Sequence, residues 1–222
     1  MIAGIRVKVC GLRSLVDAEA ADRVGADYLG FILHPKSPRC ITVEQFRAVR
    51  PRLPPRQKVA VTVEPRAEVL AGLIDAGFDH LQVHFRAETP AETVAGWAAA
   101  APGRLWLAPK LPPGTPWRPE WLAAAGTLLM DTYHATGFGG SGQTGDWDSF
   151  ARLRREHATH QWILAGGLNP QNVALALGQS GARWIDVNSG VESAPGVKDA
   201  AKLAELASAI RKHIATDPAR PQ

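Results

Sequence analysis

Cysteine is scarce in this sequence, because only Cys10 and Cys40 carry a thiol among 222 residues. Two cysteines cannot form the disulfide framework of a small secreted domain, and no Cys-x-x-Cys pair or histidine spacing suits a metal ion. No Gly-x-Gly-x-x-Gly turn follows the first strand-like segment, so the dinucleotide-binding fingerprint is missing too. We expect a protein of the reducing cytoplasm, and the sequence supports neither a metal site nor a dinucleotide cofactor.

The chain also has no long apolar segment and no strong excess of charge of one sign. No run approaches the roughly 18 apolar residues of a membrane-spanning helix, and Arg6 and Lys8 interrupt the segment where a signal peptide would have its apolar core. The 25 basic and 21 acidic residues give a net charge of +4 without a long basic stripe, and the densest cluster, 152–155, suits a solvated helix face. We expect no membrane and no nucleic acid as partners, whereas an anionic small molecule would bind readily.

No linker divides the chain. Its composition, 45% hydrophobic and 21% charged, is that of a globular protein, and no Ser-rich, Gly-rich or highly charged stretch separates two parts. A chain of this length can bury one sizeable core, so we predict a single domain over residues 1–215. Residues 216–222 are polar and contain proline, which predicts a disordered C-terminal tail.

Short apolar segments rich in β-branched residues recur along the chain, with helix-like stretches between them. They are Ile5–Val9, Tyr28–Leu33, Lys58–Val63, His80–Val83, Leu105–Ala108, Thr127–Met130, Gln161–Leu164 and Trp184–Val187. Their starts are roughly 22 to 34 residues apart, the length of a strand, a turn, a helix and a return. Eight such units predict an α/β fold, a closed parallel (βα)8 TIM barrel.

Helix-start signals support this repeat. Thr42 and Gln45 have the spacing of a capping box, and Asn169 before Pro170 has the pattern of an N-cap followed by the first helical residue. The connection 131–146 is an exception, because it is long and Gly-rich where ordinary βα loops have about two to six residues. A loop of that length is usually a lid or a binding loop.

Residues that directly follow the predicted strands are the candidates for chemistry, because active sites of such barrels lie at the C-terminal ends of the strands. Cys10 ends the first strand, and Lys8 on the same strand face could favour its thiolate; a buried structural thiol is the alternative. Asp131 follows the sixth strand, where burying a carboxyl group is costly unless it has a partner or a function. The alternative is that Asp131 only stabilises a turn or loop. His84 follows the fourth strand and either faces the cavity or is structural.

Glycine-rich segments follow the sixth, seventh and eighth predicted strands, at 139–142, 165–169 and 188–191. Glycine lets backbone N–H groups come close to an anion, and the loops after strands seven and eight hold phosphate in many barrels of this kind. Two such segments after consecutive strands favour a phosphate site over tight turns alone.

Several segments together resemble the phosphoribosylanthranilate isomerase family of tryptophan biosynthesis, in order and along nearly the whole chain. They are VKVCGLRSLVDA, GADYLGFILHPKSPRCIT, LQVH, LLMDTYHATGFGGSGQTGDWD, LAGGLNPQNV and IDVNSGVESAPGVKD. Their joint occurrence is far more specific than any single motif.

The resemblance implies a cofactor-free Amadori rearrangement of N-(5-phosphoribosyl)anthranilate to 1-(o-carboxyphenylamino)-1-deoxyribulose 5-phosphate. Matched position by position, it makes Cys10 the general base and Asp131 the general acid. Arg39 would bind the anthranilate carboxylate with its planar fork, and Asp186 would bind sugar hydroxyls. His84 is a further substrate-binding candidate because of its place after the fourth strand. The phosphate would be bound by the backbone around Gly166, Gly167, Ser189 and Gly190, under a lid that includes Gly139, Gly140, Ser141 and Gly142.

The implied chemistry constrains two pKa values. Asp131 must be protonated to open the furanose ring, and Cys10 must be a thiolate to remove the C2 proton. A free Asp titrates near 3.9 and a free Cys near 8.5, so the site has to bring the two values toward each other. We expect a bell-shaped dependence of rate on pH.

Some positions depart from the residues usual in the family. This chain has Phe85 where the family usually has Gly, and Thr62 where Phe is common. It has Asn188 in place of a common Ser and Gly145 in place of the usual Phe. None of these changes removes a proposed catalytic group. We expect Phe85 to narrow the fourth loop and to alter how the aromatic ring of the substrate sits.

Two other functions stay open at this point. One is another phosphosugar aldose–ketose isomerase on the same barrel, such as that of the histidine pathway, whose acid and base are both aspartates; Cys10 argues against it. The other is a non-catalytic barrel that binds a phosphate ligand, which Cys10 and Asp131 together disfavour. In each case the partner is a small phosphosugar, and we expect a monomer or a homodimer.

Overall fold

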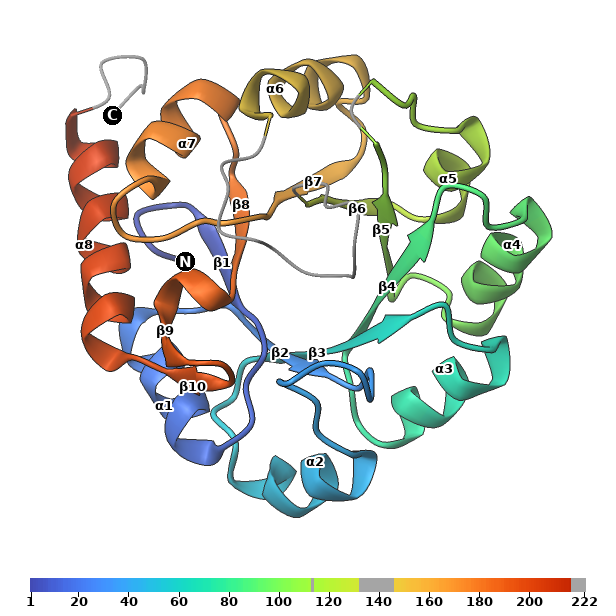
Figure 1. The fold of residues 1–222 in the computed structure, drawn as a ribbon, viewed down its shortest axis with the longest axis horizontal. Helices are drawn as coiled ribbons and strands as arrows, with labels where there is room; N and C mark the ends of the chain where they lie inside the picture. The colour runs from blue at the N-terminus through green and yellow to red at the C-terminus, as the bar shows by residue number, and fades with distance from the viewer. Residues whose placement is uncertain (113, 132–145, 217–222) are drawn as a thin grey trace.

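The structure is a computed structural model that describes residues 1–112, 114–131 and 146–216. Parallel strands β1 to β8 form a closed barrel in sequence order, and β8 pairs with β1 to close the ring. The helices surround this ring, as Figure 1 shows in a view down the barrel. The predicted (βα)8 TIM barrel is confirmed.

The strands mostly agree with the predicted ones. They are β1 (Arg6–Val9), β2 (Tyr28–Ile32), β3 (Gln57–Val63), β4 (His80–Arg86), β5 (Leu105–Lys110), β6 (Thr127–Met130), β7 (Gln161–Leu164) and β8 (Trp184–Val187). The helices are α1 (Leu15–Val24), α2 (Val43–Val49), η1 (Arg50–Arg52), α3 (Ala67–Asp75), α4 (Ala91–Ala100), α5 (Pro119–Ala124), α6 (Trp147–Glu156), α7 (Val173–Ser180) and α8 (Ala200–Thr216). The last three barrel strands have the predicted bounds, whereas β4 and β5 continue into polar residues that an apolar pattern does not include.

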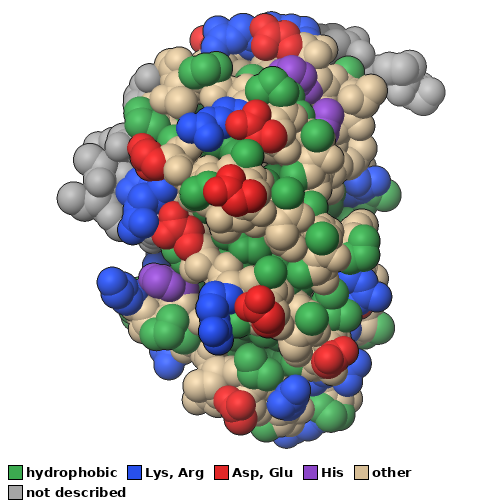
Figure 2. Space-filling model, turned by 90° about the vertical axis from the view of Figure 1, so that its right-hand side faces the viewer, with side chains coloured by type: hydrophobic (Ala, Val, Ile, Leu, Met, Phe, Trp, Pro, Cys, Tyr) green, Lys and Arg blue, Asp and Glu red, His purple; other side chains and the backbone are tan. Residues whose placement is uncertain are grey.

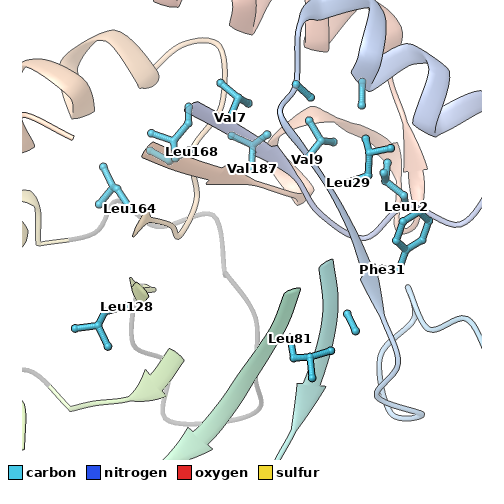
Figure 3. Packing of buried hydrophobic residues seen from close by; sticks show 14 of the residues in the cluster. Val7, Val9, Leu12, Leu29, Phe31, Leu81, Leu128, Leu164, Leu168 and Val187 are labelled. Carbon is cyan, nitrogen blue, oxygen red and sulfur yellow. The ribbon is translucent and has the colours of Figure 1, made fainter. Parts of the chain in front are cut away.

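Alternate residues on each strand face the barrel axis or the helices, and two apolar cores result. The inner core consists of Cys10, Val59, Val61, Trp106, Ala108, Leu129, Ile163, Ala165 and Trp184. The outer core lies between the strands and the helices and includes Val7, Val9, Leu29, Phe31 and Leu81 (Figure 3). This alternation decides which side chains can reach a cavity at the barrel axis.

An aromatic layer fills the barrel interior near the N-terminal ends of the strands. Tyr28 stacks on Trp184 with 4.7 Å between ring centroids, and Trp106 meets Trp184 edge-on at 4.9 Å. His80 stacks on Trp106 at 4.8 Å, and the Arg6 guanidinium lies over the Trp184 ring. Because large rings occupy the interior here, the barrel is packed at this end.

One predicted helix start is confirmed and the other is wrong. At α2, the Thr42 hydroxyl accepts from the Gln45 N–H while the Gln45 side chain accepts from the Thr42 N–H, which completes the capping box. The seventh helix starts at Val173 rather than at the Asn169-Pro170 pair. The Asn169 side chain instead accepts from backbone N–H groups of the next turn, so it stabilises a turn that precedes the helix.

Short elements that the sequence pattern did not indicate follow β8. They are η2 (Ser189–Val191) and an antiparallel hairpin of β9 (Glu192–Ala194) and β10 (Val197–Lys198). Segments this short and polar carry no periodic signal. Helix α8 includes Thr216, the first residue of the predicted tail, and residues 217–222 lie outside the described part.

Charged side chains of both signs are interspersed on the face shown in Figure 2. Within the described ranges, no helix is both long enough and apolar enough to cross a membrane. Over the same ranges, no group of three or more His, Cys, Asp or Glu residues is placed to hold a metal ion. The expected absence of metal and nucleic-acid binding stays a prediction.

Candidate active site

A cavity of about 100 Å³, open to solvent, lies at the C-terminal ends of the strands. It brings together the described residues that the sequence assigned to a site: Cys10, Arg39, His84, Asp131, Gly166, Gly167, Asp186, Ser189 and Gly190. Cys10 follows β1 and Asp131 follows β6, so the thiol and the carboxyl reach one cavity from separate strands. The predicted lid residues 139–142 lie outside the described residues.

Cys10 lies beside Lys8, as strand alternation predicted. Gly30 of β2 faces both: a Cβ atom there would be 2.9 Å from Lys8 Cε and 3.0 Å from Cys10 Sγ, so the missing side chain gives these two groups their space. Burial raises the pKa of the Cys10 thiol, and Asp186 adds to the rise, whereas Lys8 and Lys198 lower the pKa. Lys8 thus acts on the thiol in the expected direction, but burial has the larger effect and the pKa is raised overall.

Lys8 and Asp186 form a buried ion pair. They are register partners on β1 and β8, and the fully buried Lys8 ammonium donates to Asp186 Oδ2 at 2.7 Å. Burial lowers the pKa of Lys8, but the Asp186 carboxylate and Cys10 raise it by more, so Lys8 stays an ammonium. Asp186 Oδ1 has no hydrogen-bond partner among the described residues, and the side chain lines the cavity. The carboxylate therefore has capacity for another donor.

Arg39 is held by a second charged cluster, which the sequence pattern did not indicate. Its Nε and Nη2 donate to the Glu192 carboxylate over 2.7 to 3.1 Å. Lys198 Nζ donates to the same carboxylate at 2.8 Å and to Asn188 Oδ1 at 3.0 Å. The Glu192 and Lys198 side chains are 4% and 0% exposed. The available signal was that both belong to the last segment shared with the family.

His84 lines the cavity as a neutral imidazole. Burial lowers its pKa to about 3, and the positive charge of Lys8 and the nearby His34 contribute to the same shift. The Gln82 amide donates to His84 Nε2 at 2.8 Å, which suits an unprotonated nitrogen. His84 can therefore orient a ligand by hydrogen bonding without carrying a positive charge at neutral pH.

The loops after β7 and β8 touch each other at the edge of the cavity. Gly166 and Gly167 have φ angles of 92° and 63°, in the left-handed region that favours glycine. A Cβ atom at Gly190 would overlap the carbonyl oxygen of Leu168, so glycine is needed for the loops to come this close. The N–H groups of Gly166, Gly167, Ser189 and Gly190 have no acceptor among the described residues. They are available to an anion in the cavity.

Phe85 points away from the cavity, which corrects the expectation that it narrows the fourth loop. Its ring is fully buried and meets the rings of Trp97 and Trp121 edge-on. The reason is strand alternation, which turns His84 inward and Phe85 toward the helices. Thr62 is likewise not among the described residues that line the cavity.

Phe85→Leu tests this placement. We expect the substitution to lower the free energy of unfolding by about 1 kcal/mol, because a smaller side chain packs less well against the two tryptophans. The KM for the substrate should not change. Urea unfolding and steady-state kinetics measure the two quantities, and a raised KM with unchanged stability would place the ring at the cavity after all.

Comparison with known proteins gives a separate line of evidence. A family model described as N-(5'-phosphoribosyl)anthranilate (PRA) isomerase matches residues 7–209. A protein of that name from Cereibacter sphaeroides is 38% identical over 218 residues, which cover 95% of this chain and 100% of the relative. Another from Gloeothece citriformis is 36% identical, covering 91% of this chain and 92% of its own.

Solved structures give the same picture. The phosphoribosyl anthranilate isomerase of Thermus thermophilus is 34% identical with a TM-score of 0.75, and the match covers 94% of this chain and 99% of that one. An isomerase in complex with reduced 1-(o-carboxyphenylamino)-1-deoxyribulose 5-phosphate is 29% identical with a TM-score of 0.72, covering 94% of this chain and 98% of its own.

Proposed function

The chain belongs to the N-(5'-phosphoribosyl)anthranilate isomerase family, and from this premise we propose that Cys10 and Asp131 are the base and the acid of its reaction. The enzyme rearranges N-(5'-phosphoribosyl)anthranilate to 1-(o-carboxyphenylamino)-1-deoxyribulose 5-phosphate in tryptophan biosynthesis. One observation carries the two roles: a thiol and a carboxyl from separate strands line a single cavity that also has free backbone donors at its edge.

The reaction needs one acid and one base. Asp131, protonated, gives its proton to the ring oxygen; the furanose opens, and the nitrogen lone pair forms a Schiff base with C1. The thiolate of Cys10 then takes the acidified C2 proton, and the C–H electron pair forms the double bond of an enolamine. Tautomerisation moves a proton from the C2 hydroxyl to C1 and gives the ketone. Cys10 finally loses its proton to solvent, and Asp131 regains one.

The phosphate anchors the substrate between these groups. Donors for it are the backbone N–H groups of Gly166, Gly167, Ser189 and Gly190, all of which line the cavity. Backbone amides at glycine-rich turns suit a phosphate because no Cβ atom blocks the approach. Fixing one end of the sugar places its reacting carbons against Cys10 and Asp131, which replaces a costly random encounter by a positioned one.

Arg39, Asp186 and His84 orient the rest of the substrate. Glu192 occupies Nε and Nη2 of Arg39, so Nη1 is left to donate to the anthranilate carboxylate. The Asp186 carboxylate accepts from sugar hydroxyls in addition to Lys8. His84, being neutral, adds a hydrogen bond whose strength does not vary with pH near neutrality.

The activity is tested by following the fluorescence loss of freshly made phosphoribosylanthranilate with the purified enzyme. Turnover without added metal or cofactor is expected. A folded protein that binds a product analogue but does not turn the substrate over would contradict the proposed roles and favour a non-catalytic phosphate-binding barrel.

Gly190→Ala tests the phosphate site. Because the added Cβ atom would push the β8 loop away from Leu168, we expect KM to rise about 10-fold or more, as charged hydrogen bonds of roughly 1.5–3 kcal/mol are lost. Gly96→Ala in α4 is the matched control, since its Cβ atom would be 4.0 Å from the nearest atom. Equal KM values for the two variants would show that the phosphate does not bind at this loop.

We further propose that the barrel domain of residues 1–215 works as a monomer or a homodimer in the cytoplasm, without membrane or nucleic-acid partners. The free thiols of Cys10 and Cys40 suit a reducing compartment. Light scattering on the eluted protein measures the mass of the particle and decides between monomer and dimer.

A further inference from the structure

The proposed base has an electrostatic difficulty. Cys10 is 4% exposed, and burial raises the pKa of its thiol, which disfavours the thiolate that must take the C2 proton. Lys8 is the buried cation beside it, but the ammonium is already bonded to Asp186 at 2.7 Å. The thiol therefore receives only part of the effect of this cation.

The geometry joins these three groups into one unit. Lys8 and Cys10 face the axis from β1, and Asp186 faces it from β8 in direct register with Lys8. Gly30 on β2 leaves room for Lys8 and Cys10 to lie side by side, because a Cβ atom at this position would touch both side chains. Asp186 also lines the cavity, so a bound ligand can reach the carboxylate, whereas Lys8 has no exposed surface.

We propose that Asp186 couples substrate binding to the activation of Cys10: a ligand hydroxyl that donates to the Asp186 carboxylate weakens its hold on Lys8, and the Lys8 ammonium then stabilises the Cys10 thiolate. The thiol proton leaves to solvent in this step. Lys8 is a positioning residue, because it acts on the substrate only through Cys10. The inference rests on the proposed role of Cys10 as base and says when that base forms.

The other charged groups near Cys10 do not perform this coupling. Lys198 favours the thiolate, but Glu192 and Asn188 bind its ammonium. His84 is neutral. Arg39 lines the cavity with its guanidinium paired to Glu192, and Asp131 lines it from β6, where the reaction needs it protonated.

Such coupling has a chemical benefit. A thiolate reacts with oxidants and electrophiles, whereas a neutral thiol is much less reactive. The free enzyme keeps Cys10 protonated, and the reactive form appears when a sugar with hydroxyl groups occupies the cavity. Substrate therefore protects the thiolate that it helps to create.

The pH dependence of Cys10 alkylation by iodoacetamide tests the proposal without turnover. In a Cys40→Ser background, Asp186→Asn is expected to lower the midpoint of alkylation by about one to three pH units, and Lys8→Met to raise it by a similar amount. Lys212→Met on the exposed face of α8 is the matched control and should leave the midpoint unchanged. A midpoint in Asp186→Asn equal to or above that of the parent would overturn the proposal.

Additional variants cover the case in which Lys8→Met does not fold, since it leaves a buried carboxylate without its cation. Lys8→Met/Asp186→Asn removes both charges and should have a midpoint between those of the single variants. Gly30→Ala keeps every charge but separates Lys8 from the thiol, so its midpoint should rise. An unchanged midpoint in Gly30→Ala would show that proximity of the ammonium is not what sets the thiol pKa.

A ligand experiment tests the switch itself. Ribitol 5-phosphate supplies hydroxyls and a phosphate, and inorganic phosphate supplies the anion alone. Ultraviolet absorbance of the thiolate should show a lower midpoint with ribitol 5-phosphate than with phosphate in the Cys40→Ser parent, and no difference in Asp186→Asn. Equal midpoints with the two ligands in the parent would overturn the coupling, whereas loss of isomerase activity alone would bear on the proposed function.

Discussion

Cys10→Ser and Asp131→Asn are each expected to lower kcat/KM by about 10²- to 10⁴-fold, because each removes one of the two groups that transfer protons. A serine hydroxyl does not ionise near neutral pH, and an asparagine amide cannot give a carboxyl proton to the ring oxygen. Combining the two changes should cost less than the product of the single effects, since acid and base act on one reaction path. Steady-state kinetics with the fluorescent substrate measures all three variants.

Matched controls for these variants exist in the chain. Cys40→Ser removes the other thiol, and Asp148→Asn removes an exposed carboxylate in the first turn of α6; both should keep kcat/KM near that of the parent. Near-normal turnover in Cys10→Ser or in Asp131→Asn would remove that residue from the mechanism.

The dependence of rate on pH reports the ionisation of the two groups that transfer protons. Activity needs the Cys10 thiolate together with protonated Asp131, so the profile is a bell. Because burial raises the pKa of the thiol above that of an ordinary carboxyl, the limb on the alkaline side reports Cys10 and the limb on the acidic side reports Asp131. The profile of kcat/KM reports the free enzyme, whereas that of kcat reports the substrate complex. If substrate binding lowers the pKa of Cys10, the alkaline limb of kcat lies at lower pH than that of kcat/KM.

Glu192→Gln is expected to have the largest effect on stability, about 3–5 kcal/mol of unfolding free energy, because it leaves buried Lys198 without its carboxylate partner. Burial raises the pKa of Glu192, but hydrogen bonds from Arg39 and Lys198 lower it by more, so the folded protein holds it below the ordinary value. The contribution of this group is therefore present above about pH 4.5 and is lost as pH falls through its folded pKa. Urea unfolding over this range measures it.

The double variant Glu192→Gln/Lys198→Met removes the unpaired charge and should be more stable than Glu192→Gln alone. Glu205→Gln on the exposed side of α8 is the control and should stay within about 0.5 kcal/mol of the parent. If Glu192→Gln behaves like Glu205→Gln, the carboxylate does not hold Arg39 and Lys198 in the way the geometry indicates.

Much of the barrel was predictable because its signals are local. Apolar segments such as Thr127–Met130 and Gln161–Leu164 coincide with strands, since a parallel strand covered on both faces has little room for polar residues. Two-residue alternation placed Lys8 and Cys10 on the same inner face. The apolar pattern of the fourth strand ends at Val83, whereas β4 continues to Arg86, so the same alternation turns His84 inward and Phe85 outward.

The charged cluster around Arg39 was not predictable in the same way. Glu192 and Lys198 are 153 and 159 positions from Arg39 in the numbering, and they meet it only because the barrel closes and the β9–β10 hairpin folds back. Nothing in the local sequence separates a buried Lys198 from an exposed lysine. The misplaced start of α7 has a local cause, because the Asn169 side chain satisfies N–H groups of a turn as readily as those of a helix.

The aromatic layer of Tyr28, His80, Trp106 and Trp184 gives the active site a blind end. Substrate, product and the solvent that exchanges protons with Cys10 must then all pass through one mouth. The acid and the base therefore regain their starting protonation states through the same opening by which the product leaves.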